Sequence, residues 1–103
     1  MKIYYRNKKL EKILTNDRQM KKHYTSFYDN LRNRLFELKA VSNLSLISHN
    51  PPPRRHKLSG DYEGFWSIAV SRNFRILFTA YNRETKDEIN INEIVIEDIK
   101  DTH

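Results

Sequence analysis

The stretch SGDYEGFWSIAVSRNFRILF, residues 59–78, contains two short runs in which large apolar residues recur at every second position. The apolar positions are Trp66, Ile68 and Val70 in the first run, and Phe74, Ile76 and Phe78 in the second. This alternation predicts two β-strands that each bury one face, joined as a hairpin. Arg75 falls between the apolar positions, so its side chain is expected on the opposite face of the sheet.

Two further strands are expected, one before and one after this hairpin in the sequence. INEIVIEDI, residues 91–99, closes the chain as a third consecutive strand, and NRETKDE, residues 82–88, is the polar turn before it. KIYYR, residues 2–6, is short, aromatic and β-prone, and therefore predicts a strand at the start of the chain.

Two helices are expected between the first strand and the hairpin. A brief one covers residues 8–14, and a long one follows a cap at Asn16 or Asp17 and runs to about residue 40. Its apolar stripe is Met20, Tyr24, Phe27, Leu31, Leu35 and Leu38. The basic residues off this stripe are expected to form a solvated surface, with partner binding as the alternative; they are Lys21, Lys22, Arg32, Arg34 and Lys39.

Residues 42–57 cannot continue the helix, because three consecutive prolines lack amide donors. We expect a stiff loop that positions the following residues, in preference to a proline-rich ligand for an SH3-type domain. The element order then predicts a single α+β domain over residues 1–103, in which two N-terminal helices pack on one face of an antiparallel sheet with a mixed edge. The other face is expected to be partly wet or to bind something.

The charge of the chain favours a polyanionic partner. The net charge is +6, and residues 1–57 hold 14 of the 19 basic residues but only 4 of the 13 acidic ones. There is no cysteine, which excludes disulfides and thiolate chemistry, and there is no apolar segment typical of a signal peptide or membrane span. A cytoplasmic protein is the default expectation. No glycine-rich phosphate loop is present, since the chain has only Gly60 and Gly64.

Few residues could carry acid–base chemistry. His56 lies in the basic segment RRHK, and Asp101 and His103 lie at the end of the closing strand. The histidines lack the spacing of a metal site, so no metal or other cofactor is expected. Arg75 could hold a phosphate with its guanidinium, or it could form a cross-strand ion pair with Glu97 or Asp98.

At these residues the sequence resembles the HigB-like killer proteins of the RelE/ParE toxin superfamily. Their typical motifs are H-x-L-x-G-D, G-x-W-S-I-x-V, N-W/F-R-L-x-F and a final D-Y-H. The matching residues are His56, Leu58, Gly60 and Asp61, then Gly64, Trp66, Ser67, Ile68 and Val70, then Asn73, Phe74 and Arg75, and finally Asp101 and His103. The chain departs from the family at Ser59, where a lysine is usual, and at Thr102, where a tyrosine is usual.

The resemblance implies a RelE-like fold and a type II toxin that cleaves mRNA in the ribosomal A site. It also implies contact with ribosomal RNA and inhibition by a helix-turn-helix antitoxin similar to HigA. We expect metal-free cleavage through the RNA 2′-hydroxyl, with His56 and His103 as base and acid in either order and Asp101 assisting. Arg75 would stabilise the phosphate, with help from Arg54, Arg55, Lys57 and Arg72.

Two other functions stay open at this point. One is inhibition of DNA gyrase without nuclease activity, as in ParE-like relatives. The other is a non-catalytic basic module that binds nucleic acid through Arg32, Arg34 and the RRHK segment. If the protein binds nucleic acid, Trp66 could stack on a base, but its alternation with Ile68 and Val70 favours a core position.

Overall fold

A five-stranded sheet in the order β1-β5-β4-β3-β2 organises the molecule, and the computed structural model describes residues 1–101. The strands are β1 (Lys2–Tyr5), β2 (His56–Lys57), β3 (Trp66–Ala69), β4 (Phe74–Ala80) and β5 (Glu93–Asp101). β1 runs parallel to β5, and all other neighbours are antiparallel. The expected α+β class with a mixed-edge sheet is therefore confirmed, as are the initial strand, the hairpin and the closing strand.

The prediction of one long second helix, from Asn16 or Asp17 to about residue 40, was wrong, because this segment forms two helices. α1 (Lys8–Leu14) is as expected, but α2 (Asp17–His23) ends before a 3₁₀ turn at Thr25–Phe27, and α3 (Tyr28–Ala40) follows. The hydroxyl of Thr25 donates to the carbonyls of Lys21 and Lys22, at 2.8 and 3.3 Å, and thus competes with the helical hydrogen bonds there. A turn with three-residue spacing keeps the apolar stripe aligned, so the periodicity alone did not reveal the break.

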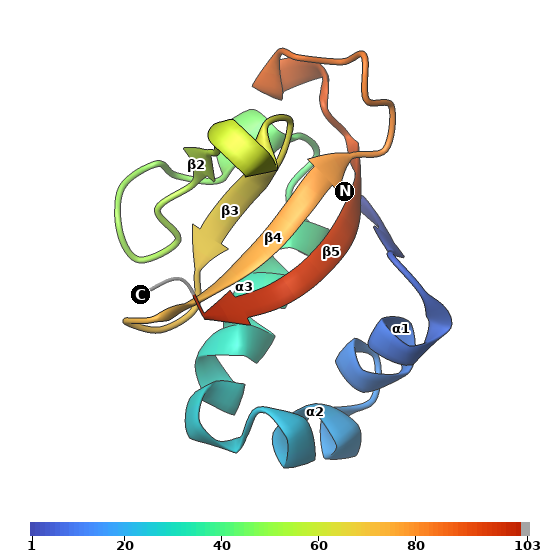
Figure 1. Ribbon diagram of the computed structural model, residues 1–103, viewed down its shortest axis with the longest axis vertical. Helices are drawn as coiled ribbons and strands as arrows, with labels where there is room; N and C mark the ends of the chain where they lie inside the picture. The colour runs from blue at the N-terminus through green and yellow to red at the C-terminus, as the bar shows by residue number, and fades with distance from the viewer. Residues whose placement is uncertain (102–103) are drawn as a thin grey trace.

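One face of the sheet is packed against the helices. Behind the strands in Figure 1, α3 crosses the sheet, while α1 and α2 extend from its lower end. Buried residues of all three helices join those of β3, β4 and β5 in one apolar cluster, which includes Leu14, Met20, Leu31, Leu35, Leu38, Ile68, Ile76, Phe78, Ile96 and Ile99. The cluster removes the alternating apolar positions of the hairpin from water, which is the main stabilising contribution of the fold.

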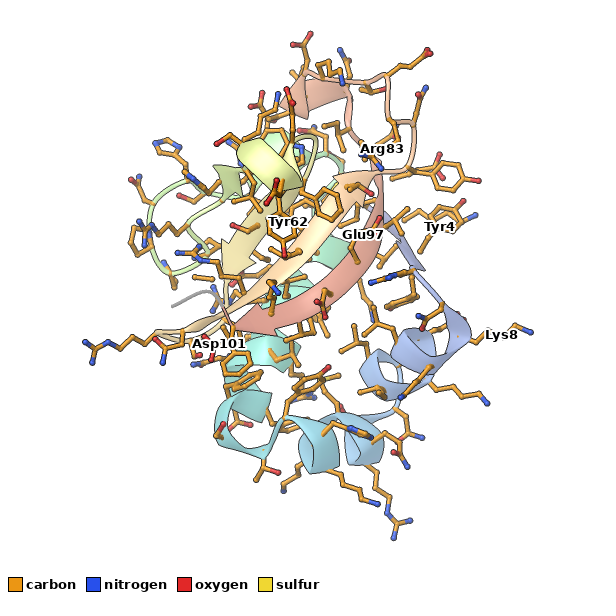
Figure 2. The ribbon with its side chains drawn as sticks, viewed as in Figure 1. Tyr4, Lys8, Tyr62, Arg83, Glu97 and Asp101 are labelled. Carbon is orange, nitrogen blue, oxygen red and sulfur yellow. The ribbon has the colours of Figure 1, made fainter. Side chains whose placement is uncertain are left out.

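The opposite face of the sheet is partly covered by the chain between β2 and β3. A 3₁₀ turn at Gly60–Tyr62 lies in front of β3, and Tyr62 extends over the sheet (Figures 1 and 2). The ring of Tyr62 packs edge-on against Phe65 at 5.7 Å, and the ammonium of Lys100 lies 5.9 Å from the Tyr62 ring. Ser67, Leu77 and Thr79 are consequently buried although they point away from the helices.

The loop expected over residues 42–57 is pinned at both ends. A 3₁₀ turn at Leu44–Leu46 is held by the hydrogen bond from Leu44 N to Ile91 O, close to a further 3₁₀ turn at Glu88–Asn90. After the prolines, the amide of Ala69 in β3 donates to the carbonyl of Pro53 at 2.7 Å. The loop ends in β2, a strand of two residues that has no sequence pattern of its own.

The basic surface expected on the helices needs one correction. Arg34 is buried, with 8% of its surface exposed, and its guanidinium pairs with Glu37 at 3.1 Å. Arg32 and the neighbouring lysines 21, 22 and 39 are exposed as expected. Arg34 therefore cannot act as a surface contact to nucleic acid. No helix among residues 1–101 is both long and apolar enough to cross a membrane.

Candidate functional site

Arg75 lies on the face of the sheet away from the helices, opposite Ala69 on β3 and Lys100 on β5. Its Nη1 atom is buried and has no hydrogen-bond partner among residues 1–101, and the same is true of the hydroxyl of Ser67, two residues before Ala69 on the same face. A buried polar atom without a partner is costly, and native structures rarely keep one without a reason. Arg75, which is only partly buried as a residue, therefore indicates a place where an anion can supply the missing acceptor, whereas Ser67 has no exposed surface for a ligand to reach.

A second arginine is brought to this place by the proline loop. The amide of Ala69 donates to the Pro53 carbonyl on the side of β3 away from β4, so Pro53 lies across β3 from Arg75, and the charge of the residue after Pro53 acts on Arg75. That residue is Arg54, whose backbone is in the left-handed region with φ of 49°. Burial lowers the pKa of Arg75, and the positive charge of Arg54 lowers it further. Two neighbouring cations raise the local potential and favour a bound anion.

The alternative role for Arg75, an ion pair with Glu97 or Asp98, is not what the structure contains. Glu97 lies at a bulge in β5 and accepts a hydrogen bond from the Thr79 hydroxyl at 2.8 Å. Asp98 aligns with Leu77 and accepts from the amide of Ile99 at 2.8 Å. Among residues 1–101, no carboxylate lies within ion-pairing distance of Arg75.

His56 shares this face of the sheet. It aligns with Ser67 on β3, whereas Arg75 aligns with Ala69, and residues 67 and 69 point to the same side of the strand. The imidazole is exposed at the edge of the sheet, on β2. His56, Arg54 and Arg75 are thus brought together by tertiary structure from two separate segments of the chain, and we refer to these three residues as the Arg75 cluster.

The end of β5 reaches the same region from the other side. Asp101 aligns with Phe74, the residue before Arg75, and lies at the end of the strand in Figure 2. Because Asp101 is paired with Phe74, its side chain is on the same side of the sheet as Phe74 and not on the side of Arg75. Phe74 stacks on Phe27 in the helical layer. Arg72 is exposed in the turn between β3 and β4. His103 and Thr102 lie outside the described residues.

Two of the expected phosphate-binding residues are directed elsewhere. The Arg55 side chain is only 13% exposed: its Nε donates to Ile47 O at 2.8 Å and its Nη1 pairs with Glu88 at 3.3 Å. Lys57 aligns with Trp66, on the side of the sheet opposite to His56, and its ammonium lies 5.6 Å from the Trp66 ring. Trp66 itself is 5% exposed and belongs to the core, which confirms that interpretation over base stacking.

Sequence reasoning missed Ser67 and Tyr62 as components of this face. Ser67 was noted only as a motif residue, and nothing in its neighbourhood signals that its hydroxyl is buried without a partner. Tyr62 lies in a polar segment, SGDYEG, whose folding over the sheet depends on contacts with β3 and β5. Among residues 1–101, no three His, Asp or Glu side chains gather as metal ligands would.

Comparison with solved structures places this fold among toxins. The YoeB/ParE toxin from Agrobacterium tumefaciens superposes with a TM-score of 0.59 at 10% identity, covering 100% of both chains. A YafQ variant from E. coli gives a TM-score of 0.59 at 12% identity, covering 96% of this chain and 90% of its own. Identities this low establish a shared fold and no more. The fold is that of the RelE-like toxins, as the sequence resemblance implied.

A family model gives the closer assignment. The model for the RelE-like toxin of type II toxin–antitoxin system HigB matches residues 3–93, and no curated protein matches the sequence. The chain belongs to the HigB-like family of RelE-like toxins. Membership in a toxin–antitoxin family implies an antitoxin as its partner.

Proposed function

We propose that this toxin is a ribosome-dependent endoribonuclease that cleaves mRNA in the ribosomal A site, in the cytoplasm. The observation that carries the proposal is the Arg75 cluster. It contains a buried guanidinium atom with no hydrogen-bond partner among the described residues, a second arginine whose charge acts on the first, and an exposed imidazole on the same face. A phosphate supplies the acceptor that Arg75 lacks and the charge that the two arginines favour. RNA is a polyanion, and unlike DNA it has a 2′-hydroxyl that can act as the nucleophile.

The proposed reaction uses the 2′-hydroxyl of the RNA. The 2′ oxygen forms a bond to phosphorus as the bond from phosphorus to the 5′ oxygen breaks, which leaves a 2′,3′-cyclic phosphate and a 5′-hydroxyl. One proton must leave the 2′-hydroxyl and one must reach the departing 5′ oxygen. Arg75 and Arg54 would stabilise the negative charge that gathers on the phosphate between these events.

The proton-transfer groups would approach the phosphate from opposite sides of Arg75. His56 is on β2 and Asp101 is on β5, with β3 and β4 between them. Three strand spacings separate β2 from β5 by about 14 Å, with β4 between them, and the Asp101 side chain takes the side of Phe74, so its proposed role is to assist and not to contact the phosphate. We propose His56 as one acid–base group and His103, assisted by Asp101, as the other. Arg72, at the nearby turn, would contact a phosphate of the same RNA.

The antitoxin partner is proposed to be a helix-turn-helix protein similar to HigA. The matched family model describes HigB toxins, and the basic surface of the toxin suits a negatively charged segment of such a partner. Ribosomal RNA would be the second macromolecular contact, since the A site is built from it.

Toeprinting of a message on ribosomes with added toxin tests this proposal. Wild-type toxin should give new 3′ ends within A-site codons. Arg75→Ala and His56→Ala should each reduce the cleavage rate by about 10² to 10³-fold. Arg18→Ala, an exposed arginine of α2, is the control and should cleave normally. Intact message with all proteins would refute nuclease activity, and loss of gyrase supercoiling in parallel would assign the ParE-like function instead.

A further inference from the structure

A second basic concavity lies at the end of the sheet remote from Asp101, where Figure 2 shows Arg83. It has a volume of about 400 Å³ and is lined by Lys57, Glu63, Gly64, Arg83 and Lys86, and we call it the Arg83 groove. Its cations come from β2 and from the turn between β4 and β5. The sequence indicated Lys57 as a partner of Arg75, but gave no reason to group it with Arg83 and Lys86.

The position of Arg83 depends on Gly64. Gly64 has φ of 89°, a backbone conformation that residues with a Cβ rarely adopt. A Cβ added there would lie 3.1 Å from Nη2 of Arg83, so the guanidinium packs directly against Gly64. The guanidinium also lies 5.8 Å from the ring of Phe65. Gly64 and Phe65, just before β3, thus form a defined contact surface for the Arg83 guanidinium.

The other two cations of the groove, Lys86 and Lys57, are held by contacts of their own. The ammonium of Lys86 donates to the carbonyl of Arg83 at 3.2 Å, and that of Lys57 lies over the ring of Trp66 at 5.6 Å. Within residues 1–101, none of the three cations is within ion-pairing distance of a carboxylate, although Glu63 lines the same groove. Residues 58–103 have only 5 basic residues against 9 acidic ones, so the gathering of two of them here is against the local composition.

We propose that the Arg83 groove binds a phosphate of single-stranded RNA next to the one held by Arg75. This inference rests on the proposed function, because it takes RNA as the polyanion. Lys57 aligns with Trp66 and Trp66 with Phe78, so Lys57 lies three residues along the strands and two strands across from Arg75, a backbone separation of about 14 Å, with its side chain on the other side of the sheet. A single RNA strand bridges that distance within a few nucleotides. Positively charged grooves that follow the backbone are typical of single-strand binding.

Binding of a fluorescent 2′-O-methyl RNA oligonucleotide, measured by anisotropy at several salt concentrations, tests the proposal. This RNA cannot be cleaved, so the result does not depend on nuclease activity. The double variant Arg83→Ala/Lys86→Ala should bind about fivefold more weakly at 0.1 M salt for each phosphate that it no longer neutralises, and its salt slope should fall by about 0.7 per phosphate. Arg18→Ala/Lys22→Ala removes the same charges from exposed positions of α2 and should leave both values unchanged.

A second variant changes the groove without changing its charge. Gly64→Ala should crowd the Arg83 guanidinium and strain a backbone with positive φ, and so reduce RNA affinity in the same direction, with circular dichroism verifying the fold. If this variant unfolds, Arg83→Lys replaces it, because it keeps the positive charge and removes the planar guanidinium. Equal effects of the groove variant and the α2 control would overturn the proposal, because the groove would then contribute only general charge. Unchanged RNA binding with weakened antitoxin binding would also overturn it, and would assign the groove to a protein partner.

In cleavage assays the groove variant should raise the RNA concentration needed for half-maximal rate and leave the rate at saturation unchanged, whereas Arg75→Ala should lower the saturated rate. If wild-type toxin does not cleave, the proposed function fails while the binding experiment still decides the role of the groove.

Discussion

The two faces of β4 show how one strand serves two purposes. On the helical side, Ile76 and Phe78 are completely buried among apolar residues. On the other side, Arg75 and Thr79 alternate with them, and β3 contributes Ser67; here burial leaves Arg75 Nη1 and Ser67 Oγ without hydrogen-bond partners in the described part of the chain. The first face gains stability from burial, whereas burial on the second face carries an energetic cost. Burial in this sheet therefore does not by itself mark a structural role.

Truncation on the helical face is expected to have the largest effect. Phe78→Ala should lower the free energy of unfolding by about 3–5 kcal/mol, because the fully buried ring leaves a cavity. Urea denaturation of the variant measures this. Phe36→Ala is the matched control: that ring is 71% exposed, and its removal should change stability by less than about 0.5 kcal/mol. Similar losses in both variants would contradict the assignment of the core.

Removal of charge on the other face should separate activity from stability. Arg75→Met keeps an apolar chain of similar reach but removes the unpartnered cation. Its cleavage rate should fall by about 10² to 10³-fold, while its free energy of unfolding stays the same or rises. A large loss of stability with normal cleavage would show instead that Arg75 belongs to the scaffold.

Neighbouring arginines provide a sharper version of the same contrast. Arg55→Ala should destabilise the fold by about 1.5–3 kcal/mol, since it removes the charge-assisted bonds to Ile47 and Glu88. Arg54→Ala should weaken RNA binding and change the unfolding free energy by less than about 0.5 kcal/mol. Thermal and urea denaturation of the two variants, with RNA anisotropy in parallel, measure both quantities. Reversed results would mean that the loop presents Arg55 to RNA in solution.

The smallest effect is expected at Ser67. Because its hydroxyl is fully buried and finds no hydrogen-bond partner within residues 1–101, Ser67→Ala should raise the free energy of unfolding by about 1 kcal/mol. Differential scanning calorimetry detects such a change in a domain of this size. A decrease would indicate that the hydroxyl is bonded in the free protein, and that the two faces of the sheet are more alike than the structure indicates.

Local patterns in the sequence were sufficient to predict most of the strands and helices of the fold. Period-2 alternation predicted the hairpin and placed Arg75 on the face away from the core, and the motif residues from His56 to Arg75 indicated the toxin family that the family model confirms. The helical stripe identified which residues face the sheet. It did not reveal the break at Thr25, because a 3₁₀ turn preserves the same spacing.

Spacing along the chain was enough to define the strands, the apolar face of each element and the family, because these depend on residues a few positions apart. Which basic residues are available to bind an anion could be read only from the folded molecule. Arg34, Arg54, Arg55 and Arg75 are the same residue type, yet within residues 1–101 Arg34 and Arg55 pair with carboxylates, whereas Arg54 and Arg75 have no such partner and the charge of Arg54 lowers the pKa of Arg75. The physical reason is that a charge interacts with whatever folding brings within a few ångströms, and those neighbours are distant in the chain.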